Sequence, residues 1–266
     1  MYIDKQLFGV SKNTLDLGVI IPTLGASLDS LRITLESIAY LDEKPLVVVV
    51  AKSNSVALSR LLAEYEADLI HEPNLGLYQA LNRGVEEIEF RCDYFTFLGD
   101  DDFLEKEGFE RLCEEGKKGV ADIIYGGINY VDLSGSTLFT NFSFPFATKI
   151  LCWAPNFIPN PGTIIRVEIW KNLNGYDEKY LLASDLDFWI RARKIATFKH
   201  VKAVAANFRF AGNSLTFSQR SKSIDESREI RKKHLGKLSL LLFIAWDPIQ
   251  IRIAEALLRF KVRLKA

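Results

Sequence analysis

Two short runs of β-branched residues near the start of the chain constrain its fold most strongly. Residues 17–21 (LGVII) end at a Pro-Thr pair, and residues 46–50 (LVVVV) show no alternation of polar and apolar side chains. Continuous apolar runs of this length are typical of strands that are buried on both faces of a parallel sheet. Between them, Leu and Ile recur at helical spacing after Ser27, which we expect to cap the helix. The pattern predicts a βαβ unit.

The same alternation continues over the first hundred residues. We expect helices over residues 56–65 and 77–88, and strands over residues 67–71 and 94–98. Strands and helices that take turns in this way indicate a doubly wound α/β sheet, in which ligands bind at the carboxyl ends of the strands. Functional side chains are therefore expected directly after the strands.

Beyond residue 120 the regular alternation ends. A glycine pair splits residues 123–130, residues 138–146 are rich in aromatic side chains, and two prolines in residues 156–162 exclude a long helix. We expect antiparallel strands and loops here, which form one wall of the ligand site. Two helices and a strand are then predicted over residues 166–173, 184–195 and 200–208.

The charge distribution separates the last fifth of the chain from the rest. The 266 residues include 34 Lys and Arg and 34 Asp and Glu, and this balance argues against non-specific binding of nucleic acid. Residues 220–266 nevertheless hold twelve basic and five acidic side chains, a net charge of +7. We therefore divide the chain into a domain over residues 1–215 and a basic, amphipathic helical segment over residues 216–266.

Cysteine usage and hydropathy indicate the cellular compartment. Cys92, Cys113 and Cys152 are widely spaced and form no CxxC pair, which fits a reducing environment. No apolar run preceded by positive charge opens the chain, so we expect no secretory signal. The longest apolar stretch, residues 238–246 (LSLLLFIAW), is about half the length of a membrane-spanning helix. These features predict a cytoplasmic protein.

The strongest candidate for a functional site is the sequence GDDD at residues 99–102, directly after a predicted strand. Adjacent carboxylates repel one another, and their pKa values rise unless a cation or several hydrogen-bond donors compensate. Carboxylate oxygens suit Mg²⁺ or Mn²⁺, which also recruit water and phosphate oxygens. The alternative is a surface turn in which Asp102 caps a helix that begins near Leu104.

Two further segments place polar side chains where strands or loops are expected to end. In the sequence SDLDFW, Asp185 and Asp187 lie two positions apart and do not share a helix face; both also suit an ordinary helix N-terminus. In the sequence NLGLYQALNRG, Gly76 allows the backbone to approach a ligand, and Asn82 and Arg83 reach towards the strand ends. The alternative for this segment is a plain loop-to-helix junction with Arg83 in solvent.

Taken together, these segments resemble the family 2 glycosyltransferases, which have the GT-A fold. The resemblance rests on the order VIIPT, VVVV, HEPNLGLYQALNRG, FTFLGDDDFL and NPGTIIRVEIWKNLNGYDEKYLLASDLDFWIRA, over roughly residues 16–210. It implies an α/β fold with a mostly parallel central sheet flanked by helices. It also implies transfer of a hexose from a nucleotide-diphosphate donor, for which we expect a UDP-sugar, with inversion at the anomeric carbon.

The resemblance assigns roles to single residues. Asp185 matches the family's catalytic carboxylate, which takes a proton from the acceptor hydroxyl. Asp101 and Asp102 match its acidic motif, which holds the metal ion, Mn²⁺ or Mg²⁺, and the ribose of the donor. Either Asp100 or Asp101 begins the equivalent pair. The implied donor-binding positions are Pro22, Thr23, Asn74, Gly76, Asn82, Arg83, Asp100 and Asp101.

Two departures from the family pattern keep other functions open. Many relatives have an aspartate-rich turn after the second strand that helps to hold the nucleotide base, whereas this chain has the sequence AKSNS, so the identity of the base is not determined. Relatives often carry a histidine where this chain has Asn160 or Pro161. These differences favour, as an alternative, a protein that binds a nucleotide-sugar with weak or no turnover. The other alternative, a sugar nucleotidyltransferase, conflicts with residues 22–30 (PTLGASLDS), which lack a basic phosphate loop.

The C-terminal residues combine apolar and basic side chains. Residues 249–264 have the composition of an interfacial helix on anionic lipid, although residues 258–265 also alternate as a strand would. The alternative is packing onto the catalytic domain or onto a second copy in a homo-oligomer. We expect residues 238–266 to contact the inner face of a membrane. Such contact suits a glycan or lipid-linked acceptor in surface polysaccharide synthesis.

Overall fold

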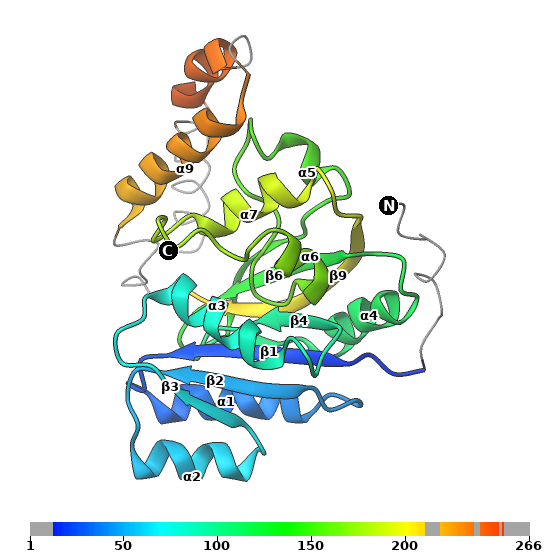
Figure 1. The fold of residues 1–266 in the computed structure, drawn as a ribbon, viewed down its shortest axis with the longest axis vertical. Coiled ribbons are helices and arrows are strands. Elements are labelled where there is room, and N and C mark those ends of the chain that lie inside the picture. Colours follow the sequence, from blue (N-terminus) through cyan, green and yellow to red (C-terminus); the bar gives the residue numbers. More distant parts are fainter. Residues whose placement is uncertain (1–12, 211–218, 237–239, 250–251, 253–266) are drawn as a thin grey trace.

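A computed structural model describes residues 13–210, 219–236, 240–249 and 252 (Figure 1). One sheet of nine strands runs in the order β3-β2-β1-β4-β8-β6-β9-β5, and β7 pairs with β6 beside this path. The strands are β1 (Leu17–Thr23), β2 (Leu46–Ala51), β3 (Asp68–His71), β4 (Tyr94–Phe97), β5 (Phe103–Leu104), β6 (Ile123–Val131), β7 (Thr137–Asn141), β8 (Ile164–Arg166) and β9 (Phe198–Arg209). The helices are α1 (Leu28–Ala39), α2 (Val56–Glu64), α3 (Leu77–Ile88), α4 (Lys106–Lys117), α5 (Ala147–Ile150), α6 (Val167–Asn172), α7 (Ser184–Ala192) and α9 (Arg220–His234).

The first four strands form the parallel part of the sheet, in the order β3-β2-β1-β4. All the elements predicted for the first hundred residues are present, with bounds that differ by at most two residues. Ser27 caps α1 as predicted, because its side chain accepts a hydrogen bond from the backbone of Ser30.

Two hydrophobic cores cover the two faces of this sheet. Val19 and Ile21 of β1 face the core that holds α1, α2 and α4, whereas Ile20 faces the core that holds α3, α6 and α7. Successive side chains of a strand point to opposite faces, so a strand between two cores is apolar at every position. This burial explains the uninterrupted apolar runs in the sequence.

The second half of the sheet mixes parallel and antiparallel pairs. β8 lies antiparallel between β4 and β6, β7 is antiparallel to β6, and β9 is parallel to β6. The predicted break at Gly126 and Gly127 is wrong, because β6 continues through both glycines with shifts in its register. A Cβ at either position would lie within 2.6 Å of a neighbouring carbonyl oxygen, so both sites require glycine.

The alternative interpretation of the acidic residues, in which Asp102 caps a helix that begins near Leu104, is wrong. Residues 103–104 form the short strand β5, and Glu105 is the N-cap residue of α4. Asp102 instead accepts hydrogen bonds from the backbone of Gly99 and Arg209. Asp102 is therefore buried inside the fold, and its carboxylate binds backbone N–H groups of Gly99 and Arg209 instead of capping α4.

Gly108→Ala is expected to destabilise the fold by about 3 kcal/mol, the upper part of the range for overpacked sites. A Cβ at Gly108 would lie 1.6 Å from the carbonyl oxygen of Val204, so α4 would have to move away from β9. Gly236→Ala is the matched control, since a Cβ at Gly236 would have no atom of the described residues, apart from its chain neighbours, within 4 Å. Urea unfolding measures both changes; equal midpoints would contradict the prediction.

The C-terminal elements lie at the upper end of the molecule in Figure 1. α9 packs beside α7, and a further helix spans residues 240–249. The predicted strand-like pattern over residues 258–265 lies outside the described residues. Among the residues that are described, no helix combines the length and apolar character needed to cross a membrane.

Candidate active site

A cavity of about 770 Å³ opens beyond the carboxyl ends of β1 and β4. Pro22 of β1 and the loop after β4 line one side, and the first turn of α7 lines another. Arg209 at the end of β9 and several residues of α9 complete the wall. The cavity lies where the strand pattern predicts ligand binding.

The three predicted acidic residues separate into two groups. Asp101 and Asp102 line the cavity, whereas Asp100 accepts a hydrogen bond from the hydroxyl of Thr23 at 2.5 Å. Asp102 is fixed at both oxygens, by the backbone N–H of Gly99 at 3.2 Å and of Arg209 at 3.0 Å. Within GDDD, Asp101 and Asp102 are therefore the pair that faces the cavity.

The electrostatics of this trio favour a bound cation. Burial raises the pKa of Asp100 and, together with the charge of Asp100, the pKa of Asp101. Burial and the charge of Asp101 raise the pKa of Asp102 to about 8. Adjacent buried carboxylates stay ionised together when a cation compensates their charge.

The chemistry of the donor set fits Mg²⁺ or Mn²⁺, since both prefer oxygen ligands and retain waters and phosphate oxygens. Over the described part of the chain, no group of three His, Cys, Asp or Glu side chains is placed to hold an ion. Asp101 and Asp102 would therefore hold such an ion together with ligands from outside the protein.

Asp185 lies in the first turn of α7 and lines the same cavity. The hydroxyl of Tyr78 donates to one carboxylate oxygen at 3.3 Å, and the amide of Asn156 donates to the other at 3.2 Å. Burial raises the pKa of Asp185, while these two hydrogen bonds oppose the rise. Burial and the charge of Asp185 raise the pKa of Tyr78 well above that of an ordinary tyrosine, so its hydroxyl stays protonated.

Tyr78→Phe is expected to move the acidic limb of the pH–activity profile to higher pH. The lost hydrogen bond stabilises the Asp185 anion, so its removal raises the pKa of Asp185. A carboxylate base takes a proton only when it is ionised, so the acidic limb of the pH–activity profile lies at the pKa of Asp185. Initial rates of nucleotide release against pH measure the shift. Tyr125→Phe is the control, because that hydroxyl donates to the Phe144 carbonyl; a limb at the same pH in Y78F contradicts the prediction.

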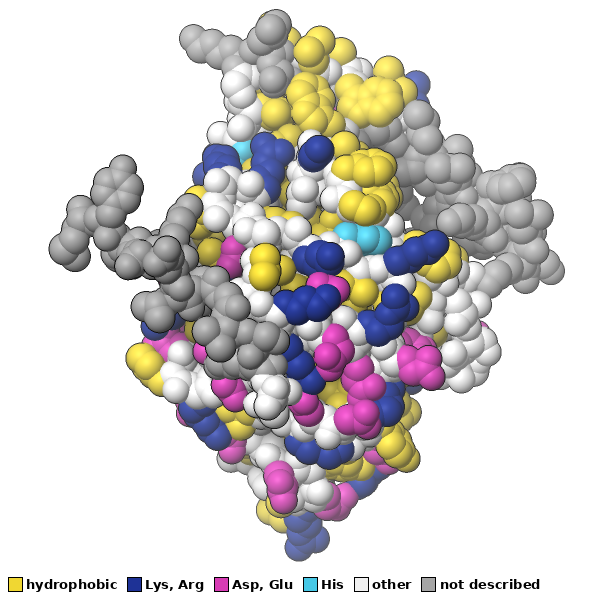
Figure 2. Space-filling model, turned by 90° about the vertical axis from the view of Figure 1, so that its right-hand side faces the viewer, with side chains coloured by type: hydrophobic (Ala, Val, Ile, Leu, Met, Phe, Trp, Pro, Cys, Tyr) yellow, Lys and Arg dark blue, Asp and Glu magenta, His cyan; other side chains and the backbone are white. Residues whose placement is uncertain are grey.

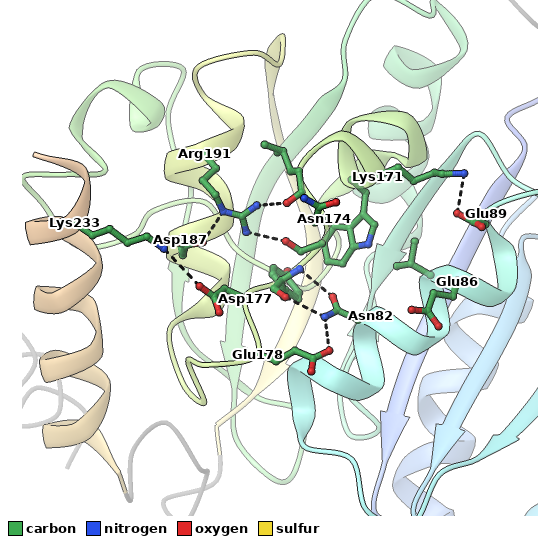
Figure 3. Close-up of a pocket in the computed structure, with 15 residues that line it drawn as sticks. Asn82, Glu86, Glu89, Lys171, Asn174, Asp177, Glu178, Asp187, Arg191 and Lys233 are labelled. Carbon is green, nitrogen blue, oxygen red and sulfur yellow. Dashed lines mark hydrogen bonds and ion pairs between the residues drawn. The ribbon is translucent and has the colours of Figure 1, made fainter.

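Asp187 has a structural environment on the other side of α7. The side chain is fully buried and bonds Arg191 at 2.6 Å and His234 at 3.0 Å. Burial opposes ionisation, but these contacts outweigh it and lower the pKa of Asp187 to about 2. Figure 3 shows Asp187 between Arg191 of α7 and Lys233 of α9. Of the two aspartates in SDLDFW, only Asp185 lines the 770 Å³ cavity.

The structure does not bring all predicted donor residues to this cavity. Asn82 lines a second cavity, where its amide binds the backbone of Tyr176 at 3.0 and 2.9 Å and Glu178 at 3.0 Å (Figure 3). Arg83 forms ion pairs with three glutamates, and the nearest lies at 3.5 Å. Asn74 is exposed, and Gly76 is the N-cap residue of α3. Their donor-binding roles remain predictions without support from this arrangement.

Sequence reasoning missed several residues of the site. Tyr78 and Asn156 contact Asp185, and Arg209 and Arg231 line the cavity. Tyr78 lies in the segment NLGLYQALNRG, but the sequence does not distinguish it from the other apolar residues on the same helix. Nothing in the sequence marks Arg231, because its place depends on how α9 packs. Asn160 does line the cavity, and its side-chain oxygen accepts a hydrogen bond from Tyr176 at 2.6 Å.

The fold and this site define a glycosyltransferase of the GT-A type. The family model described as glycosyl transferase family 2 matches residues 18–171, and the chain belongs to this family. A chondroitin synthase of Escherichia coli is 21% identical over 187 residues, which cover 68% of this chain and 27% of that protein. A glycosyltransferase of Methanocaldococcus jannaschii, described as uncharacterized, is 24% identical over 188 residues, 66% of this chain and 63% of its own length.

Solved structures share the fold. S. aureus TarS 1-349 in complex with UDP-GlcNAc has a TM-score of 0.60 and 16% sequence identity, over 81% of this chain and 64% of that chain. The same protein in complex with UDP has a TM-score of 0.56 and 16% identity, over 83% of this chain and 70% of that chain. The chain thus spans about a quarter of the chondroitin synthase and about two thirds of TarS 1-349.

Proposed function

We propose that this protein transfers a sugar, with inversion, from a UDP-sugar to a glycan or lipid-linked acceptor in surface polysaccharide synthesis. One observation supports the proposal above all: Asp101, Asp102 and Asp185 line a single cavity from two different elements. This arrangement provides negative charge for a metal-bound diphosphate on one side and a base on the other.

The protein's own residues account for the acceptor side of the reaction. The Asp185 carboxylate takes the proton of the attacking hydroxyl, while Tyr78 and Asn156 hold both of its oxygens in place. On the donor side, Asp101 and Asp102 would hold Mn²⁺ or Mg²⁺, which when bound stabilises the charge that develops on the leaving diphosphate. A single displacement inverts the anomeric carbon, so no enzyme nucleophile is required.

The relatives support the choice of substrates. The structures of TarS with UDP and with UDP-GlcNAc favour a uridine donor for this chain. The chondroitin synthase of E. coli and a hyaluronan synthase of Pasteurella multocida, 25% identical over 142 residues, favour a polysaccharide product.

A panel of UDP-, GDP- and dTDP-sugars tests the donor in thermal-shift measurements with and without Mn²⁺. We expect UDP-sugars to raise the unfolding temperature, and to raise it further with Mn²⁺, because a ligand that binds only the folded state stabilises it. Incubation with the donor that binds and a set of glycan acceptors then tests transfer. Absence of a shift with every nucleotide-sugar would contradict the proposed function.

We further propose that the helix over residues 240–249 rests on an anionic membrane surface at the cytoplasmic face. Phe243 and Asp247 point inward, and Asp247 pairs with Arg228 of α9 at 2.6 Å. Leu241, Leu242 and Ile244 are mostly exposed. Figure 2 shows hydrophobic side chains gathered at this upper end of the molecule, with charged side chains spread over the middle.

Lys232, in the last turn of α9, is exposed, and its charge complements anionic lipid. Sedimentation with vesicles of phosphatidylglycerol tests the contact. We expect Leu241→Ser/Leu242→Ser to weaken binding, and Phe90→Ser, at an exposed site next to α3, to leave it unchanged. Equal binding of both variants would contradict the proposed surface.

A further inference from the structure

Helix α9 binds the backbone immediately before Asp185. The carboxylate of Glu226 accepts hydrogen bonds from three consecutive backbone N–H groups, those of Leu181 at 3.1 Å, Leu182 at 2.8 Å and Ala183 at 3.1 Å. Ala183 is the N-cap residue of α7 and provides no side-chain cap of its own. The N–H group of an N-cap residue has no partner within the helix, so Glu226 takes that place for Ala183 and also binds the two N–H groups just before the helix.

The same helix binds the backbone on the other side of Asp185. The guanidinium of Arg231 donates to the carbonyl of Leu151 at 3.2 Å and to the carbonyl of Ala154 at 2.7 Å. Arg231 is only 6% exposed. Ala154 lies two residues before Asn156, whose amide donates to the Asp185 carboxylate. Arg231 therefore fixes the turn that presents one of the two hydrogen-bond donors of Asp185.

A third contact fixes α9 itself against α7. His234 bonds the buried carboxylate of Asp187 at 3.0 Å, and Lys233 approaches it at 3.6 Å. Figure 3 shows α9 and α7 side by side, with Lys233 directed at Asp187 and Asp177. Glu226 and His234 are eight residues apart, about 12 Å along a helix. α9 is thus attached to α7 at two separate points.

We propose that Glu226 and Arg231 are positioning residues that hold Asp185 in its catalytic geometry. The inference rests on the proposed function, since it gives Asp185 the role of the base. Glu226 fixes the chain that carries Asp185, and Arg231 fixes the turn that carries Asn156. A base must lie within hydrogen-bond reach of the proton that it takes, and a displacement of about 1 Å costs about a hundredfold in rate. Within the basic C-terminal segment, α9 then supports the catalytic geometry of the active site.

Substitutions at Glu226 test the proposal in the full-length protein. Glu226→Ala removes all three hydrogen bonds, whereas Glu226→Gln keeps one acceptor oxygen and can retain two of them. We expect kcat to fall by about tenfold in E226Q and about a hundredfold in E226A. The dissociation constant for UDP with Mn²⁺ should stay within about twofold of the unaltered protein, because Glu226 does not line the cavity.

Glu229→Ala is the matched control. Glu229 lies three residues further along α9 and pairs with the side chain of the exposed Lys179 in the same loop, at 2.5 Å. We expect kcat and UDP affinity close to those of the unaltered protein. Arg231→Lys retains the charge but cannot reach both carbonyls, so it should lower kcat. Because Arg231 also lines the cavity, UDP affinity is compared only between the variants of Glu226 and Glu229.

Hydrogen exchange separates this inference from the proposed function, because it needs no substrate. The amides of residues 181–183 should exchange faster in E226A than in E229A, and E226Q should lie between them. Unchanged exchange, or a kcat in E226A equal to that in E229A, overturns the positioning role. If the unaltered protein shows no transfer with any donor, the proposed function fails, and the exchange data still decide whether Glu226 holds this segment.

Discussion

Asp185→Asn is expected to lower the rate of sugar transfer by about a hundred- to ten-thousandfold, which is the usual contribution of a general base. The amide has nearly the shape of the carboxylate but cannot take the proton of the acceptor hydroxyl. Donor binding should persist, because Asp185 approaches the cavity from α7, whereas the acidic pair Asp101 and Asp102 follows β4. Release of UDP in the presence of acceptor, and calorimetric titration with UDP, measure the two properties.

Asp177→Asn is a suitable control, since Asp177 lies in the loop before α7, is half-buried and pairs with Lys233 at 3.5 Å. It should retain most of the transfer rate. If D185N transfers sugar as fast as D177N, Asp185 is not the base. If neither variant nor the unaltered protein transfers sugar while all of them bind UDP, the alternative of a nucleotide-sugar-binding protein is supported.

The parallel half of the fold was predictable because its signals are local. The strands β1, β2 and β4 lie between two cores, and each helix that covers them has its own apolar stripe. The continuity of β6 was not predictable in this way. The sequence pattern predicts that its two glycines interrupt the strand. In the fold, these glycines instead allow the carbonyl groups of Ala203 and Asn141 to approach β6, and those residues lie further along the chain.

In the candidate site, too, the residues marked by local sequence were predictable, and those placed by distant contacts were not. The acidic residues were found because charge directly after a buried strand is conspicuous in a sequence, and Asp185 was separated from Asp187 only by the resemblance to a family. Asn82 looked equally suitable, but its amide binds the backbone of Tyr176. Glu226 could not be identified from the sequence, because its partners are backbone N–H groups 43 to 45 residues away.

Asp101→Asn is expected to remove the dependence of donor binding on Mn²⁺ and to lower transfer by about a hundredfold. A bound metal ion contributes several kcal/mol of transition-state stabilisation, and about 1.4 kcal/mol corresponds to a tenfold change in rate. Asp101 is a cleaner test than Asp102, because both oxygens of Asp102 also accept backbone hydrogen bonds that hold the turn. Titration of UDP with and without Mn²⁺, and transfer rates before and after EDTA, measure the effect.

Asp100→Asn decides which aspartate begins the metal-binding pair. The carboxylate of Asp100 accepts a hydrogen bond from the hydroxyl of Thr23, and an amide oxygen can accept the same bond. We therefore expect D100N to keep its response to Mn²⁺ and to lose less activity than D101N. The opposite result, with D100N insensitive to Mn²⁺ and D101N responsive, would assign the metal to Asp100 and Asp102.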